Sequence, residues 1–320
     1  MENGAVLKEQ HQGKPNDDFR DYQEEGRIQF ITFHPSYSYE EFIEGITVET
    51  KGENIACENP QYKLKSGIFK NMCKKALAVA IDVSPEDSNR LSWREIFEIY
   101  QKKDNIDFSK APKYVLIIDE INRGDIAKIF GELITLIEAD KRLKQSSELI
   151  VTLPASGDSF GVPPNLYIIG TMNTADRSIA LLDVALRRRF GFIEMSPDFS
   201  ILMKEHIDRN KTELESNQVY NLLVKSSEAI QRINKRLCAD KTIGRDRQIG
   251  HSFLFKVFTI EDLLLVWKHE IFPLLEEYCY SDYKKINYLL FNKDGDTEWI
   301  SELEGIRKIQ DIYKMIQAIV

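Results

Sequence analysis

The sequence predicts an α/β fold with a parallel sheet flanked by helices, followed by a mainly helical C-terminal domain. Two continuous apolar runs, Tyr114–Ile118 and Leu166–Thr171, are typical of strands buried on both faces of a parallel sheet. Segments with the helical spacing of apolar residues alternate with these runs. We therefore expect three parts: a poorly ordered or truncated N-terminal segment (1–26), an α/β core (27–197) and a helical domain (198–320).

The first half of the expected core begins with a strand, Ile28–Phe33, which ends before Pro35 because proline cannot continue the ladder. A helix is expected from about Tyr39. Segment 45–65 contains several residues that interrupt regular structure, so we predict an insertion with one or two short strands. Helical spacing then returns, and we expect helices over residues 67–81 and 93–100.

The second half of the core contains a helix, a hairpin and a further helix and strand. Asp125 is placed to cap a helix whose apolar residues keep helical spacing up to Ile137. The turn Ala155–Asp158 separates two extended segments and predicts a hairpin. Further along we expect a helix over Ser178–Arg189, a strand over Phe190–Met195 and, in the helical domain, a loop with a short extended segment (Gly244–Phe255).

Composition excludes several classes of protein. The chain has 320 residues, 42% of them hydrophobic, and a formal charge of -8, so its overall field does not favour a phosphate backbone. Any DNA contact is therefore expected to be indirect, through a complex. Four scattered cysteines support neither a zinc site nor a disulfide framework. Because no run approaches the roughly 18 apolar residues of a membrane span, we expect a cytoplasmic protein without membrane contact.

Polar residues follow the two predicted buried strands. Asp119 and Glu120 come directly after the first, and Asn173 follows the second. In an open parallel sheet the carboxyl ends of the strands form the ligand-binding edge, so the three residues should emerge together. An aspartate that holds Mg²⁺ and a glutamate that orients water are the groups that phosphoryl transfer requires. The alternative is that the acids only charge a strand end and that Asn173 is a turn residue.

Arg187, Arg188 and Arg189 close the helix expected after Asp176, Arg177 and Ser178. A cation cluster is favourable at any helix C-terminus, which is the structural explanation of the arginines. The functional alternative is an arginine finger that reaches the γ-phosphate bound by a neighbouring subunit.

Several strings together resemble the McrB-type AAA+ GTPases, the motor subunits of modification-dependent restriction systems. They are Thr-Phe-His-Pro-Ser-Tyr-Ser-Tyr from Thr32, Ile-Asp-Glu-Ile-Asn-Arg-Gly from Ile118, Gly-Thr-Met-Asn-Thr-Ala-Asp-Arg-Ser from Gly170, and Ile-Gly-His-Ser-Phe from Ile249. The sequence Tyr-Val-Leu-Ile-Ile-Asp-Glu from Tyr114, which overlaps the second string, looks like a Walker B motif. The resemblance implies an AAA+ P-loop NTPase-like core and a helical lid.

The resemblance also implies roles for residues. Asp119 would bind Mg²⁺, Glu120 would be the catalytic carboxylate, and Asn173 would sense the γ-phosphate of GTP or ATP. Arg188 or Arg189 would be the arginine finger acting on a neighbouring subunit. Asp176 and Arg177 would shape the nucleotide-binding signature loop at the subunit junction. The implied assembly is a hexameric ring stimulated by an McrC-like nuclease subunit, which performs the cleavage.

The sequence departs from the family at one point. No Gly-x-x-x-x-Gly-Lys-Ser/Thr loop occurs in the 320 residues, so the backbone cradle, lysine and hydroxyl that hold phosphates are missing. We therefore expect weak or absent hydrolysis by the isolated chain and an N-terminal truncation of the motor subunit. Two alternatives stay open: a degenerate, non-hydrolysing ring or scaffold subunit, and a MoxR- or dynein-like remodelling ATPase.

Overall fold

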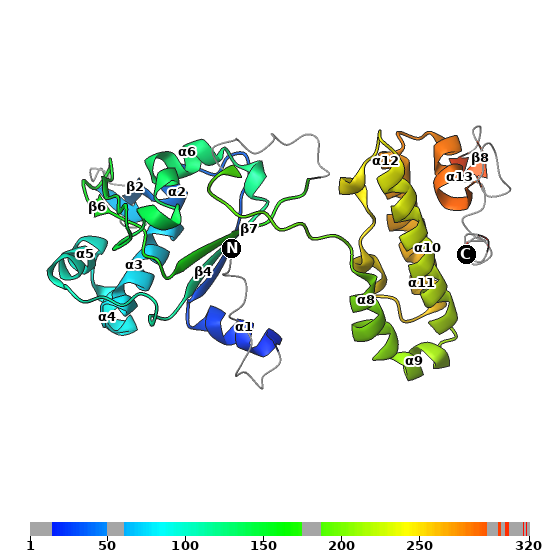
Figure 1. Cartoon of the computed structure of the whole chain (residues 1–320), viewed down its shortest axis with the longest axis horizontal. Coiled ribbons are helices and arrows are strands. Elements are labelled where there is room, and N and C mark those ends of the chain that lie inside the picture. The colour runs from blue at the N-terminus through cyan, green and yellow to red at the C-terminus, as the bar shows by residue number, and fades with distance from the viewer. Residues whose placement is uncertain are drawn as a thin grey trace, which may run out of the picture. The chain divides into compact units, whose positions relative to one another are not determined.

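The chain forms two compact units, Met1–Gly191 (unit 1) and Phe192–Val320 (unit 2) (Figure 1). The structure is a computed structural model that describes residues 15–49, 61–174, 187–292, 300–301, 305–306, 316 and 318. Each unit has its own hydrophobic core. The units are therefore described one at a time.

Unit 1 is built on a parallel sheet in the order β1-β4-β7. The strands are β1 (Ile28–Thr32), β4 (Tyr114–Asp119) and β7 (Leu166–Gly170), so all three predicted strands of this part are confirmed. Within the ladder, Thr32 pairs with Asp119 and Ile118 pairs with Gly170. The carboxyl ends of the strands therefore lie at one edge of the sheet, with Asp119 on the middle strand.

The two faces of the sheet differ in burial, which corrects the prediction that the strands are buried on both faces. On one face Leu116 and Ile118 are fully buried beneath α3 (Ile68–Ala80), which contacts β4 and β7. On the other face Phe30, Tyr167 and Ile169 are 53%, 49% and 52% exposed. Successive strand residues point to opposite faces, and the described elements cover only one of these faces completely.

The remaining helices of unit 1 are short, and two of them begin at identifiable capping signals. Serines cap two of them with full capping boxes, Ser38 with Glu41 and Ser92 with Glu95. In the helix capped by Ser92, the apolar residues that the sequence spaces along one face are buried. The helices are α1 (Pro15–Glu24), α2 (Tyr39–Phe42), α4 (Pro85–Arg90), α5 (Trp93–Lys102) and α6 (Ile126–Phe130).

The helix predicted after Asp125 is capped as expected but is shorter. The Asp125 side chain accepts a hydrogen bond from the Lys128 amide at the start of α6. The helix ends at Phe130, and the chain continues as a 3-10 turn, η2 (Gly131–Thr135). Gly131 has φ +51°, a left-handed conformation that glycine adopts easily, so it interrupts the run that apolar spacing alone suggested to be continuous.

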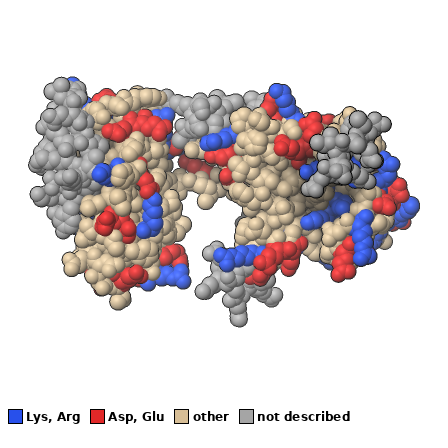
Figure 2. All heavy atoms as spheres, turned by 180° about the vertical axis from the view of Figure 1, so that it is seen from behind, with Lys and Arg blue, Asp and Glu red and all other residues tan. Residues whose placement is uncertain are grey.

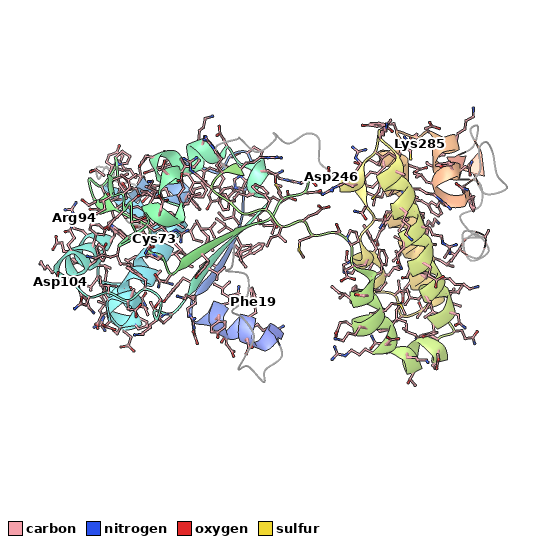
Figure 3. All side chains as sticks on the ribbon, in the orientation of Figure 1. Phe19, Cys73, Arg94, Asp104, Asp246 and Lys285 are labelled. Carbon is pink, nitrogen blue, oxygen red and sulfur yellow. The ribbon has the colours of Figure 1, made fainter. Side chains whose placement is uncertain are left out.

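Two antiparallel hairpins branch from the core, one where the sequence predicted an insertion with one or two short strands and one where it predicted a hairpin. One consists of β2 (Glu44–Glu49) and β3 (Gln61–Ser66), and the other of β5 (Val151–Thr152) and β6 (Ser159–Phe160). Both are anchored at a buried lysine of α3. Lys70 Nζ lies 2.6 Å from Glu44 Oε2 and 2.9 Å from Asp158 Oδ2. Arg94 of α5, labelled in Figure 3, also pairs with Asp158.

Unit 2 is mainly helical, as predicted. The long helix α10 passes through its centre and buries Leu223, Ile230 and Ile233. Its Asn234 holds a loop by exchanging two hydrogen bonds with the backbone of Ile249. The elements are α8 (Phe199–Leu202), η4 (Met203–Asp208), α9 (Lys211–Ser216), α10 (Tyr220–Ala239), α11 (Ile260–Val266), η7 (Trp267–Ile271), α12 (Phe272–Tyr278), α13 (Tyr283–Phe291), β8 (Ile300–Ser301) and β9 (Gly305–Ile306).

Two predicted extended segments are wrong, and one predicted helix cannot be followed. Residues 191–198 have no regular structure, and Ile193 and Met195 are exposed, because no described strand pairs with the segment expected over Phe190–Met195. Within Gly244–Phe255 the chain forms two 3-10 turns, η5 (Arg245–Arg247) and η6 (His251–Leu254), instead of an extended segment. Of the helix predicted over Ser178–Arg189, residues 178–186 lie outside the described residues.

Candidate functional site

The end of β4 is fixed from both sides. Asp119 is the last residue of this strand, and its carbonyl oxygen accepts a hydrogen bond of 2.9 Å from the Phe33 amide after β1. On the other side the Thr171 amide donates to the carbonyl oxygen of Ile118 at 2.9 Å. The ladder therefore continues past the strand ends and sets the direction in which the Asp119 side chain leaves the sheet.

Glu120 turns the chain away from the sheet in an uncommon conformation. Its φ and ψ are 52° and 46°, the left-handed region, which costs a residue with a side chain about 1–3 kcal/mol. The turn continues as η1 (Ile121–Arg123), with the buried Ile121 packed on β7. Gly170 allows this approach, since a Cβ there would lie 2.9 Å from Ile121 Cδ1. Packing thus holds Glu120 in place.

Thr171 joins the two acids through one hydroxyl group. Its Oγ1 donates to Asp119 Oδ1 at 2.5 Å and accepts from the Glu120 amide at 3.2 Å. The Thr171 carbonyl oxygen also accepts from the Ile121 amide at 2.9 Å. Sequence reasoning did not single out this threonine. The available signal was its place at the end of the second predicted buried strand, on the edge where the acids were expected.

Two buried oxygen atoms at this edge lack a hydrogen-bond partner among the described residues, Glu120 Oε2 and Asn122 Oδ1. Arg123 Nε lies 3.3 Å from Glu120 Oε2, which makes an ion pair but not a hydrogen bond of good geometry. Buried acceptors without donors are uncommon in folded proteins and suggest a ligand, ion or water. The edge therefore offers carboxylate and amide oxygen atoms to a donor or cation.

The remaining predicted residues divide into three groups. Asn173 is exposed and lies two residues after Thr171, on the chain that leaves the same edge of the sheet. Asp176 and Arg177 lie outside the described residues. Arg188 is exposed, whereas Arg189 is 17% exposed and its Nε lies 2.8 Å from Glu138 Oε1. Of the two arginine-finger candidates, Arg189 thus already pairs with an acid of its own unit.

The donor set at the edge fits a hard divalent cation that also binds phosphates. Carboxylate oxygens suit Mg²⁺, which usually takes one or two carboxylates and completes its ligands with water and substrate phosphates. Among the described residues no group of three or more His, Cys, Asp or Glu side chains could hold a metal ion without such help. Nearby, hydrogen bonds from the Lys128 side chain and amide lower the pKa of Asp125 and keep it anionic.

A cavity of about 690 Å³ lies elsewhere in unit 1, against the β2–β3 hairpin and α3. Its lining mixes acids and lysines, among them Glu40, Lys65 and Lys74, and does not include the acids of β4. Its charges show no preference for one kind of ligand. The candidate site therefore rests on the edge of the sheet and not on this cavity.

Comparison with known proteins identifies both units. The family model described as "AAA domain (dynein-related subfamily)" matches residues 21–190, and the model described as "McrB, alpha-helical lid domain" matches residues 225–287. The chain therefore belongs to the AAA family, in its dynein-related subfamily. Within that family it is an McrB-type AAA+ protein, as the lid match and the relatives described next indicate, and this membership implies nucleotide binding.

Two curated relatives are restriction enzyme components. The chain is 36% identical over 264 residues to the "Type IV methyl-directed restriction enzyme EcoKMcrB subunit" of Escherichia coli (strain K12), covering 80% of this chain and 48% of that protein. It is 25% identical over 206 residues to the "Type II restriction enzyme BsuMI component YdiS" of Bacillus subtilis (strain 168), covering 62% and 57%. The chain thus spans about half the length of the curated relatives it matches.

Within the described part of the chain, no helix combines the length and the apolar character needed to cross a bilayer.

Proposed function

We propose that this chain is the nucleotide-hydrolysing motor subunit of a modification-dependent DNA restriction complex in the cytoplasm. One observation carries the proposal: two adjacent acids end the middle strand of an AAA-family sheet and are joined by the Thr171 hydroxyl at its ligand-binding edge. The names of both curated relatives, which describe restriction enzyme components, support the biological setting.

In this proposal each residue of the edge has one task. Asp119 would hold Mg²⁺, which when bound neutralises charge on the β- and γ-phosphate oxygens of GTP or ATP. Glu120 orients and polarises the attacking water, and Asn173 contacts the γ-phosphate. Arg188 is the better candidate for an arginine finger that acts on a neighbouring subunit, because Arg189 is paired with Glu138.

The proposed assembly is a homo-oligomer, a hexameric ring, with an McrC-like nuclease subunit as partner. Asp176 and Arg177 would lie at the junction between subunits. The nuclease subunit cuts the DNA, and this chain contacts DNA only through the complex. The net charge of -8 supports that division, and Figure 2 shows acidic and basic side chains interspersed over the visible face.

The test measures phosphate release from GTP and from ATP. We expect slow release by the isolated chain, because its 320 residues contain no glycine-rich phosphate loop, and faster release with a co-expressed McrC-like subunit. The substitution Glu120→Gln keeps the shape of the side chain and removes its charge, so it should lower release by at least about 100-fold. Gln23→Glu, on α1, is a surface control without effect.

Two results would contradict the proposal in different ways. Release that is the same in wild type and Glu120→Gln would reject Glu120 as the catalytic carboxylate. Rapid release by the isolated chain that disappears in Glu120→Gln would support the site but reject our account of the phosphate loop.

A second candidate function is that of a non-hydrolysing ring or scaffold subunit, which the lack of a glycine-rich loop in the sequence favours. Such a subunit would form tight oligomers and bind neither fluorescent GTP nor fluorescent ATP. A remodelling ATPase of the MoxR or dynein-like type is a further alternative. An McrC-like gene beside the gene for this chain would favour restriction, as the lid match does.

A further inference from the structure

We propose that Thr171 is the positioning residue that sets both acids of the site at once. The proposal rests on the proposed function, because the acids are positioned for a metal–nucleotide complex. Thr171 itself touches neither the nucleotide nor the reacting atoms in this account. It acts through Asp119 and Glu120.

The chemistry of the groups fixes the direction of both hydrogen bonds. The Glu120 amide can only donate, so the Thr171 hydroxyl oxygen is the acceptor at 3.2 Å. An ionised carboxylate can only accept, so the single hydroxyl hydrogen points at Asp119 Oδ1, at 2.5 Å. The hydroxyl group thus connects a side chain and a backbone that follow each other in sequence. A methyl group in its place could form neither contact.

The backbone of Thr171 makes the position of this hydroxyl stiff. Its amide donates to Ile118 and its carbonyl oxygen accepts from Ile121, so it bridges the residues before and after the two acids. Threonine is also branched at Cβ, which limits rotation of the side chain. The hydroxyl group is therefore held by the ladder between β4 and β7 and not by a mobile loop.

Two consequences follow for the site. With Oδ1 bonded to Thr171, the Asp119 carboxylate is held in one orientation, in which it would hold the cation of the proposed site. The bond to the Glu120 amide supports the left-handed turn from which the Glu120 side chain departs. Outer hydrogen bonds of this kind commonly change metal affinity or activity by about 10–100-fold when they are removed.

The experiment compares Thr171→Val, which keeps the shape and removes the hydroxyl group, with the control Thr171→Ser, which keeps the hydroxyl group. The first measurement is the ¹H–¹⁵N signal of the Glu120 amide in the full chain without nucleotide. The second is the Mg²⁺ concentration that gives half-maximal phosphate release by the complex with the McrC-like subunit. We expect Thr171→Val to shift the Glu120 signal and to raise the Mg²⁺ midpoint about ten-fold, and Thr171→Ser to change the midpoint less than two-fold.

A merely structural role would lower the amount of folded protein without moving the Mg²⁺ midpoint. Thermal melting of both variants is therefore measured to check that they are folded. If Thr171→Val does not fold, Thr171→Ala repeats the test. An unchanged Glu120 signal or an unchanged Mg²⁺ midpoint in the folded valine variant would overturn the role of Thr171 alone. A wild-type complex that releases no phosphate would instead overturn the proposed function, and this role with it.

Discussion

Lys70 is a buried charge whose two acidic partners come from different hairpins. Its side chain is 2% exposed, as is appropriate only for a lysine that is fully paired. Glu44 belongs to β2, and Asp158 lies in the turn between β5 and β6. The Glu44 carboxylate also accepts a hydrogen bond of 2.9 Å from the Ser156 amide. One lysine therefore fixes both hairpins to α3.

We predict that Lys70→Met lowers the free energy of unfolding of unit 1 by about 3–5 kcal/mol, because it leaves the buried Glu44 carboxylate without its cation, whereas Asp158 keeps Arg94. Arg94→Gln is the matched control in the same cluster. Arg94 is 61% exposed, so its loss should cost at most about 1 kcal/mol. Urea unfolding measured by circular dichroism checks both values. Equal effects of the two substitutions would show that burial does not decide the strength of these pairs.

The sequence predicted the acids of the site but not what holds them. Asp119 and Glu120 stand out because they end a continuous apolar run, a signal that is local in sequence. The role of Thr171 depends on the register between β4 and β7, which places residues about 50 positions apart side by side. The ion pair of Arg189 with Glu138 is likewise a tertiary contact. Spacing in one sequence does not reveal such contacts.

At the scale of elements, the end of α10 depends on an aspartate. Asp240 follows the helix and accepts a hydrogen bond from the Thr242 amide at 2.8 Å. Lys285 of α13, labelled in Figure 3, lies 2.8 Å from the Asp240 carboxylate. Burial opposes ionisation of Asp240, but the hydrogen bonds from Lys285 and Thr242 outweigh it and lower its pKa to about 2. The ionised side chain thus joins two helices.

The lowered pKa of Asp240 predicts that the stability of unit 2 depends on pH. Because the pKa of Asp240 is lower in the folded chain than its ordinary value of 3.8, the stabilisation is complete above about pH 4 and is lost as the pH falls toward 2. We predict that Asp240→Asn loses roughly 1–2 kcal/mol at pH 5 and has a shallower decline below pH 4. Urea unfolding between pH 5 and pH 2.5 measures both. Lys285→Met should show a similar dependence of stability on pH. If the stabilities of wild type and Asp240→Asn decline in parallel as the pH falls, the pH dependence does not come from Asp240.

The helices were easier to predict than some strands, for a physical reason. Helical spacing records contacts within one segment, and the face of α5 with Trp93 and Tyr100 is buried as its spacing indicated. A strand also needs a neighbouring strand to pair with, and the spacing of residues within one segment does not show whether such a partner exists. The segment Phe190–Met195 has the apolar content of a strand but no described partner, so it does not form one. The break at Gly131 was missed because apolar spacing continues through it.

At the scale of the whole molecule, the proposed ring predicts complementation between two inactive variants. Arg188→Ala removes the arginine that would act on a neighbour but keeps the acids of its own site. Glu120→Gln removes the catalytic carboxylate of its own site but keeps the arginine that would act on a neighbour. We predict that each variant alone releases phosphate at least about 100-fold more slowly than wild type, and that a mixture recovers part of the activity. Phosphate release from GTP and ATP by complexes assembled from both variants checks this.

Arg189→Ala is the comparison for that experiment. Its pairing with Glu138 predicts lower stability of unit 1 and no comparable complementation. A mixture no more active than its separate components would argue against an arginine shared between subunits. Complementation by Arg189→Ala instead of Arg188→Ala would exchange the roles of the two residues.

The family could be predicted from the sequence because its strings are specific, and the match of the lid domain confirms it. The choice between GTP and ATP could not be predicted, because it depends on contacts with the base that no string of this sequence identifies.

The face of the sheet in unit 1 that the described elements leave exposed also affects how the purified protein should be handled. Phe30 on β1 and Tyr167 and Ile169 on β7, the strands on either side of β4, present large apolar side chains to solvent. Attraction between such surfaces grows on warming from the cold and in sulfate or phosphate salts, whereas urea weakens it. Cold storage in chloride buffers should therefore keep the preparation clear, and ammonium sulfate should precipitate it at unusually low concentration.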